Sequence, residues 1–235
     1  MSLEKDIRSR LGKLPEGLKD AYDELYDRIQ ARSESERRIA DSAFQWVMCA
    51  CAPLTTEELL PAVCQDINHD TFKSPGEDID EDLVLELCHN FLTIDPTRGV
   101  WVPSHLSVIE YFENHRWSQK QANCLAASVC LLLLNDPAYN GQEDSSGNRA
   151  SYGFYIYARH HWMTHVKNYG EEGIINDRLS ALVKRFLGSP SDSSVAYRQW
   201  HAMIGGEMYK DIPRSSFYDV YPFSLSDLEP SSSAT

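Results

Sequence analysis

The stretch FLTIDPTRGVWVPSHLSVIEYF, residues 91–112, decides the fold. Residues 91–94 and 100–102 are short runs of aromatic and β-branched side chains, and residues 95–99 between them are typical of a turn. This arrangement predicts a β-hairpin. After Pro103 the apolar residues recur at helical spacing as far as His115, which predicts a helix directly after the hairpin.

An amphipathic helix is predicted from Leu14 to Ile29, and three more helices are predicted between it and the hairpin. Ser33 and Glu36 fit a capping box at the start of a helix that continues through residue 51, until Pro53 ends it. A short helix follows over residues 55–63, and residues 80–88 form the next one, with acids in its first turn. Three helices, a hairpin wing and a closing helix are the order of a winged helix.

The second half of the chain contains only helical patterns. They cover residues 119–134, 151–168, 174–187 and 194–204. The predicted fold class is therefore mainly α, with a winged helix followed by a helical bundle. The predicted organisation is a helical lead-in from a preceding domain over residues 1–32, a winged-helix domain over 33–116, a helical domain over 117–210 and an irregular tail over 211–235.

The composition predicts a cytoplasmic globular protein. Of the 235 residues, 42% are hydrophobic and 11% aromatic, and the formal net charge is -13. The longest nearly uninterrupted apolar stretch, residues 125–134, is about half as long as a bilayer span, and no signal segment opens the chain. We therefore expect no membrane partner. The six cysteines lie in apolar patterns, which favours free thiols over disulfides.

Charge argues against binding of nucleic acid by this winged helix. Winged helices often place the helix before the hairpin in the major groove and neutralise phosphates with Lys and Arg. Between Leu54 and Asp95 the sequence has eleven acids and one base, Lys73. The sequence therefore predicts no nucleic acid partner.

The chain lacks the motifs of the common catalytic sites, so we expect no enzyme activity. The phosphate-binding patterns G-x-G-x-x-G and G-x-x-x-x-G-K-[ST] and the nucleophile pattern G-x-S-x-G do not occur. Ser104, His105, Ser107 and Glu110 are neighbours on one turn, whereas the partners of a catalytic triad normally come from separate elements.

Two patterns resemble metal sites but lack part of the ligand set. Asp78, Asp80 and Asp82 alternate as in a calcium loop, without its central glycine and distal Glu. His161 and His165 lie one helical turn apart, without the Glu or the Cys pair that accompanies histidines in zinc sites. A solvated helix start and a packing surface are the simpler interpretations. The sequence predicts no metal and no cofactor in this chain.

Several short motifs gain specificity from their order and spacing along roughly residues 14–204. They are Leu14-Pro-Glu-Gly-Leu-Lys-Asp-Ala-Tyr22, Trp46, Pro53-Leu-Thr-Thr-Glu-Glu-Leu59, His105-Leu-Ser-Val-Ile-Glu-Tyr-Phe112, Tyr157-Ala158 with Trp162 and His165, and Tyr197-Arg-Gln-Trp200. This set resembles the region after the NACHT NTPase domain in fungal NACHT–ankyrin proteins, which are NLR-like STAND receptors. It is also similar to the GPI inositol-deacylase winged helix domain family, whose label is no evidence for deacylase activity here.

The resemblance implies a noncatalytic regulatory segment. Its partners in cis would be an upstream NACHT NTPase domain, which binds ADP or ATP in the full-length protein, and downstream ankyrin repeats. In NLR relatives a histidine in the pattern Phe-x-His-x-Ser-x-x-Glu-Tyr/Phe contacts the β-phosphate of ADP. His105, Ser107, Glu110 and Tyr111 match this pattern, with Pro103 in place of the Phe. The resemblance thus implies that His105 senses nucleotide; a capping or packing histidine is the alternative.

A second interpretation needs no nucleotide. The acidic face around residues 78–86 could dock a basic protein, which would make the chain a stand-alone protein–protein interaction module. Binding that weakens with salt would favour this alternative.

Overall fold

The computed structural model describes residues 17–76, 78–139, 151–170, 176–189 and 192–205. The first seven elements are α2 (Leu18–Gln30), α3 (Glu34–Cys49), α4 (Thr56–Val63), α5 (Glu81–Leu87), β1 (Leu92–Asp95), β2 (Val100–Pro103) and α6 (Leu106–His115). The others are α7 (Gln119–Leu134), the 3-10 helix η1 (Pro137–Tyr139), α8 (Tyr152–Tyr169), α9 (Asp177–Leu187) and α10 (Val195–Gly205). This order confirms the predicted fold class. The predicted tail over 211–235 lies outside the described residues.

Local sequence signals explain where the helices begin. At the start of α3 the Ser33 backbone N–H donates to Glu36 Oε2 at 3.0 Å, and the Glu36 N–H donates to Ser33 Oγ at 3.4 Å, so the capping box is confirmed. Asp80 caps α5 by accepting from the Leu83 N–H at 2.8 Å.

The end of α3 differs from the expectation. The helix ends at Cys49, and Ala50 has left the helical conformation with a ψ of 132°. Pro53 lacks an N–H and disfavours helical geometry in the residue before it, so the chain leaves the helix before it reaches the proline. As a result Cys51 lies outside the helix and is exposed.

The wing is an antiparallel hairpin with a tight connection. Its register places Thr93 opposite Val102. The Asp95 carboxylate closes the turn by accepting from the Thr97 N–H at 2.8 Å. Gly99 has a φ of +63°, a conformation that glycine adopts without the steric cost of a side chain.

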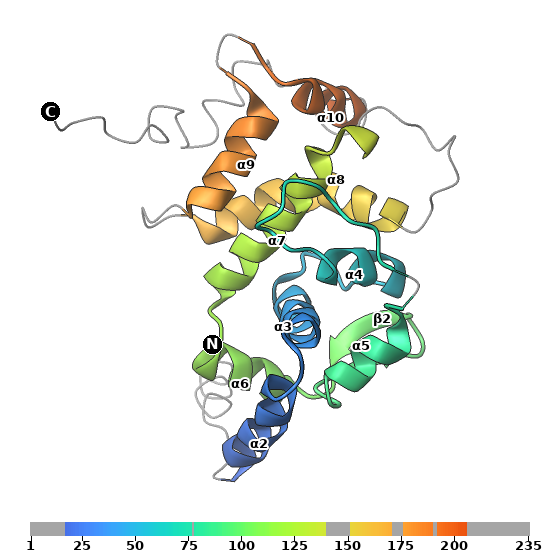
Figure 1. The fold of residues 1–235 in the computed structure, drawn as a ribbon, viewed down its shortest axis with the longest axis vertical. Helices are drawn as coiled ribbons and strands as arrows, with labels where there is room; N and C mark the ends of the chain where they lie inside the picture. The colour runs from blue at the N-terminus through green and yellow to red at the C-terminus, as the bar shows by residue number, and fades with distance from the viewer. Residues whose placement is uncertain (1–16, 77, 140–150, 171–175, 190–191, 206–235) are drawn as a thin grey trace, which may run out of the picture.

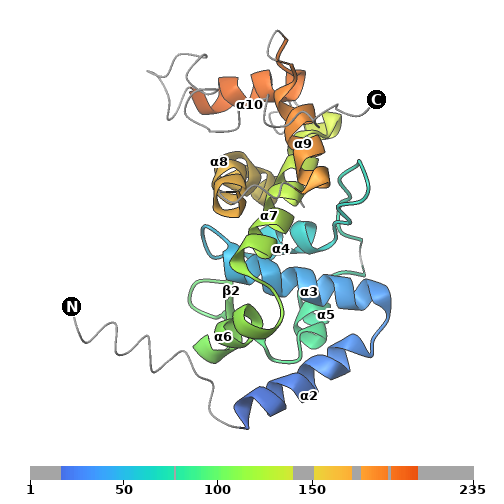
Figure 2. The ribbon, with the colours of Figure 1, turned by 90° about the vertical axis from the view of Figure 1, so that its left-hand side faces the viewer.

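Helix α3 packs on two sides, which joins the winged helix to the helical bundle. On one side Phe44 stacks on Phe112 of α6, with ring centroids 4.4 Å apart. Trp46, which is fully buried, meets the ring of Phe154 in α8 edge to face at 5.4 Å. Figures 1 and 2 show α3 between the winged-helix elements and the C-terminal helices. The two predicted domains therefore share one hydrophobic core.

Helix α7 connects the two parts of this core. It packs against α3, α8 and α9, and in Figure 2 it passes from the winged helix toward the upper helices. At its end the Asn135 amide donates to the Leu182 carbonyl at 3.1 Å. Among the helices that the structure describes, none has the length and apolarity to cross a membrane. The buried residues of α7 are Ala122, Asn123, Cys124, Ala126, Ala127, Ser128, Val129, Cys130, Leu131, Leu132, Leu133 and Leu134.

The shared core gives a testable stability difference on α8. Phe154 is fully buried, so Phe154→Ala should lower the free energy of unfolding by about 3–5 kcal/mol through lost burial and a cavity. Tyr152 lies on the same helix with 44% of its surface exposed, and Tyr152→Ala should cost less than about 1 kcal/mol. Urea unfolding of both variants measures this. Similar losses for the two would contradict the described core.

Candidate functional site

His105 lies at the junction between the wing and α6. After β2 the Ser104 N–H donates to the carbonyl of Phe91, the residue before β1, at 2.9 Å, which holds the start of the connection beside β1. His105 caps α6 from an extended backbone, with φ -154° and ψ 152°. Its side chain is exposed, and the next residue, Leu106, keeps 65% of its surface exposed. A histidine and a leucine therefore stand together at the surface.

The ring of His105 is held by Ser107 and, through it, by Tyr22. The His105 Nδ1 lies 3.2 Å from the backbone nitrogen of Ser107, which can only donate, so Nδ1 is an acceptor. The Ser107 hydroxyl, 2.7 Å from the same Nδ1, then donates to it. This leaves the Ser107 oxygen to accept from the Tyr22 hydroxyl on α2, 2.7 Å away. The neutral ring consequently carries its proton on Nε2.

Helix α2 is fixed on the winged helix by a second polar cluster. Asp23 accepts from the Tyr111 hydroxyl at 2.7 Å and from Arg116 at 3.0 Å, and it also pairs with Lys19. The hydrogen bond from Lys19, followed by the one from Tyr111, lowers the pKa of Asp23. The Arg116 guanidinium lies 4.1 Å from the ring centroid of Tyr26, a cation–π contact. The helix that precedes the winged helix in sequence is thus packed on it.

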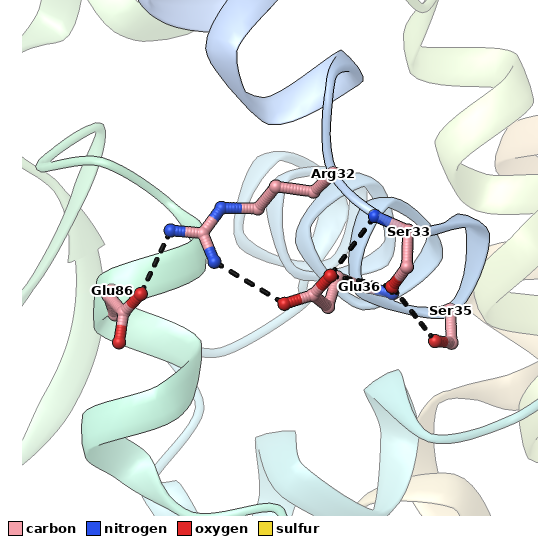
Figure 3. A network of polar contacts seen from close by, with 5 residues as sticks. All are labelled: Arg32, Ser33, Ser35, Glu36 and Glu86. Carbon is pink, nitrogen blue, oxygen red and sulfur yellow. Dashed lines mark hydrogen bonds and ion pairs between the residues drawn. The ribbon is translucent and has the colours of Figure 1, made fainter.

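A third polar cluster ties the turn between α2 and α3 to α5, as Figure 3 shows. Arg32 donates to Glu86 of α5 at 2.9 Å and to Glu36 of α3 at 3.4 Å. Glu36 also accepts from the Ser33 hydroxyl at 2.6 Å, which is the largest cause of its lowered pKa. Arg32 therefore neutralises one end of the acidic helix.

The rest of the acidic segment faces water. Asp78, Asp80, Glu81 and Asp82 are all exposed, and Asp80 is engaged as the cap of α5. Within the described residues, no three His, Cys, Asp or Glu side chains are grouped closely enough to hold a metal ion. The arrangement of an exposed acidic first turn behind the Asp80 cap is that of a solvated helix start.

His165 of α8 has the packing role that the sequence favours for it. His165 is fully buried, and its Nδ1 lies 2.8 Å from Asn123 Oδ1. The Asn123 nitrogen donates to the Gln119 carbonyl, so its oxygen accepts the Nδ1–H of His165. The His165 Nε2 then accepts from the Tyr157 hydroxyl at 2.9 Å. Both ring nitrogens bind protein groups, and burial lowers the pKa of His165 to about 4.

Sequence reasoning misses a Cys–His–Asn arrangement that the fold creates. Cys51 Sγ lies 3.8 Å from His165 Nε2, and Asn123 orients the same ring, as in cysteine hydrolases. The chemistry differs, because burial raises the pKa of Cys51 while that of His165 falls to about 4. The thiol keeps its proton where the imidazole has already lost its own, so no thiolate–imidazolium pair forms. Cys51 and His165 are 114 positions apart in the sequence, so no local sequence pattern predicts their contact.

A polar cleft of about 350 Å³ opens beside α3, between α2 and the turn at residues 66–68. Two of its charged side chains form an ion pair, since Arg38 lies 3.0 Å from Asp66. Asp41 accepts from the Tyr26 hydroxyl at 3.1 Å, and burial raises the pKa of Asp41. With both signs of charge present, the lining selects no single class of charged ligand.

The region around His105 matches a known domain family. Residues 26–123 match the family model of the GPI inositol-deacylase, winged helix domain. The match begins in α2 and ends in α7, so the matched region includes the wing and His105. It agrees with the observed order of three helices, hairpin and closing helix, and it supports the coarser part of the predicted resemblance. No curated protein and no solved structure matches the chain.

Burial of His165 predicts a defined pH dependence of stability. The pKa of His165 is about 4 in the folded protein against about 6.5 when unfolded, so the neutral ring is favoured by folding. Its stabilising effect is complete above pH 6.5 and is lost as the pH falls toward 4, because only the unfolded chain takes up the proton there. When the pH is lowered from 6.5 to 4, the free energy of unfolding of the wild type should fall by on the order of 3 kcal/mol more than that of His165→Gln.

Urea unfolding of both proteins at several pH values measures this difference. The substitution also removes a buried hydrogen bond and lowers stability at every pH, so the slope against pH, and not the absolute value, is compared. Parallel slopes for the wild type and His165→Gln would contradict a neutral, buried His165.

Proposed function

We propose that the chain is a noncatalytic regulatory segment of a fungal NACHT–ankyrin receptor of the STAND type. It would act in the cytoplasm and couple the nucleotide state of an upstream NTPase domain to downstream ankyrin repeats. The winged helix and the helical bundle share one core, so a displacement of the winged helix by a neighbouring domain moves both as one rigid body. This rigidity suits a relay between two neighbours.

The observation that carries the proposal is the state of His105. Its ring is exposed at the wing–α6 junction, and its Nδ1 is already occupied by Ser107. The Nε2–H is consequently a donor directed away from the helix cap, the group that a phosphate oxygen requires. ADP held by the upstream domain would bridge to this donor, and loss of the bridge would release the winged helix domain.

The noncatalytic part of the proposal rests on the side-chain chemistry of the described residues. The one Cys–His–Asn arrangement described above holds a thiol with a raised pKa beside an imidazole with a lowered one. The His105–Ser107 pair lies on a single turn of α6, and its hydroxyl is 2.7 Å from Tyr22, not beside a carboxylate. Neither arrangement activates a nucleophile.

Binding of ADP tests the role of His105. In the protein with its upstream NTPase domain, His105→Ala should weaken ADP binding about 10- to 100-fold, the effect of losing one hydrogen bond to a charged group. Isothermal titration calorimetry measures the two dissociation constants. His115→Ala is the matched control, because His115 is also an exposed histidine but lies at the other end of α6. Equal affinities for the wild type and His105→Ala would overturn the sensor role.

A second candidate is a stand-alone interaction module that binds a basic protein through its acidic face. The observation that favours it is that Asp78, Asp80, Glu81 and Asp82 are exposed and none has an ion-pair partner among the described residues. Such a surface attracts cationic segments at low salt. Binding of a decalysine peptide that weakens with salt and with Asp78→Asn/Asp82→Asn would support this candidate; binding unaffected by either would exclude it.

A further inference from the structure

We infer that Ser107 and Tyr22 are positioning residues that hold the His105 ring ready to donate and connect it to α2. The inference rests on the proposed function for its biological meaning, but its physical content lies within this chain. Three groups form one continuous chain of hydrogen bonds: the Tyr22 hydroxyl, the Ser107 hydroxyl and His105 Nδ1, with both hydroxyl contacts at 2.7 Å.

The direction of this chain follows from one obligatory donor. The Ser107 backbone N–H can only donate, so its contact with His105 Nδ1 makes that nitrogen an acceptor. The single hydroxyl proton of Ser107 then points to Nδ1, and its oxygen is free to accept from Tyr22. Each hydroxyl has one proton to donate, so the Ser107 hydroxyl cannot donate to Nδ1 and to Tyr22 at the same time. Hydrogen bonds arranged in this way strengthen one another.

Burial of Ser107 protects the middle of this chain of hydrogen bonds from competing water. Ser107 is buried with 8% of its surface exposed, whereas His105 is exposed. The ring of Tyr22 packs against Phe91 and Tyr111 at 5.3 and 5.2 Å, which fixes its hydroxyl over Ser107. One end of this chain of hydrogen bonds, His105, therefore reaches the surface, and the other end, Tyr22, belongs to α2.

This arrangement gives α2 a way to respond to His105. A ligand that displaces the His105 ring moves Nδ1, the acceptor of the Ser107 hydroxyl. The Ser107 oxygen in turn accepts the hydrogen bond of the Tyr22 hydroxyl, so the displacement reaches α2. Conversely, a displacement of α2 withdraws Tyr22 and frees the Ser107 hydroxyl to turn away from Nδ1. The relation is reciprocal, as thermodynamic linkage requires. Tyr26 lies on the same helix but donates to Asp41 of α3, so it stands outside this chain.

The first test uses the chain without nucleotide. With ¹⁵N-labelled histidine, long-range ¹H–¹⁵N spectra at about pH 8.5, where the ordinary imidazole is neutral, report which ring nitrogen carries the proton. The His105 signals are those missing from His105→Ala. In the wild type we expect the ¹⁵N chemical shift of His105 Nδ1 to be that of a nitrogen without a proton. Ser107→Ala removes the hydroxyl donor and keeps the backbone N–H donor, so it should move this signal part of the way toward the average of a freely exchanging ring, and Tyr22→Phe should move it in the same direction but less far.

Matched variants separate positioning from folding. Tyr22→Phe keeps the packed ring and removes only the hydroxyl, and Tyr26→Phe makes the same change on the same helix without touching the chain of hydrogen bonds. Tyr26→Phe should leave the His105 signals in place. The inference is overturned if Ser107→Ala and Tyr22→Phe both leave the His105 signals at their wild-type positions.

The second test adds the upstream domain and ADP. Tyr22→Phe and Ser107→Ala should each weaken ADP binding about 3- to 10-fold in the wild type and have no further effect in the His105→Ala background, whereas independent structural losses would add. If the spectra change as expected but no variant alters ADP affinity, the positioning role stands and nucleotide sensing fails. If His105→Ala weakens ADP binding while the other two variants change neither readout, sensing stands and the positioning role is overturned.

Discussion

The structure depends on the burial of α7. This helix is apolar on nearly every side, so it cannot lie on the surface of one module, and α3, α8 and α9 must cover it together. That requirement makes the helical bundle continuous with the winged helix. A boundary drawn near residue 117 from the sequence therefore separates two regions that share a core. The shared core is the physical reason to expect them to move as one unit.

The surface features follow from this rigid interior. The stacked rings of Phe44 and Phe112 hold α6 on α3, and the wing delivers the chain to the start of α6. His105 can be exposed and still ordered because its Nδ1 caps the helix that this packing immobilises. Capping and sensing are therefore compatible roles for one imidazole: one nitrogen serves the fold, and the other is left for a partner.

Local signals allowed much of the fold to be predicted from the sequence. The capping box of Ser33 and Glu36 and the turn before Gly99 involve residues within a few positions of one another, and both are present. The end of α3 was less predictable, because the helix breaks before Pro53 instead of at it.

The candidate site was predictable only in part. The position of His105 at the start of α6 followed from the helix pattern, whereas its link to Tyr22 runs through Ser107, which lies 85 positions from Tyr22 in the sequence. The contact between Cys51 and His165 likewise depends on how α8 folds back onto α3. Such contacts are set by tertiary packing, and the periodicity of a single sequence does not predict them. The role of α2 could not be read from its own pattern for the same reason, since a lead-in helix and a docked helix are equally amphipathic.

A crystal structure of the protein with its upstream NTPase domain and bound ADP tests the central claim most directly. Our account predicts His105 Nε2 within about 2.7–3.2 Å of a phosphate oxygen, with the Ser107 hydroxyl still on Nδ1. A His105 ring that faces solvent away from the nucleotide, in a structure where ADP is clearly bound, would contradict it.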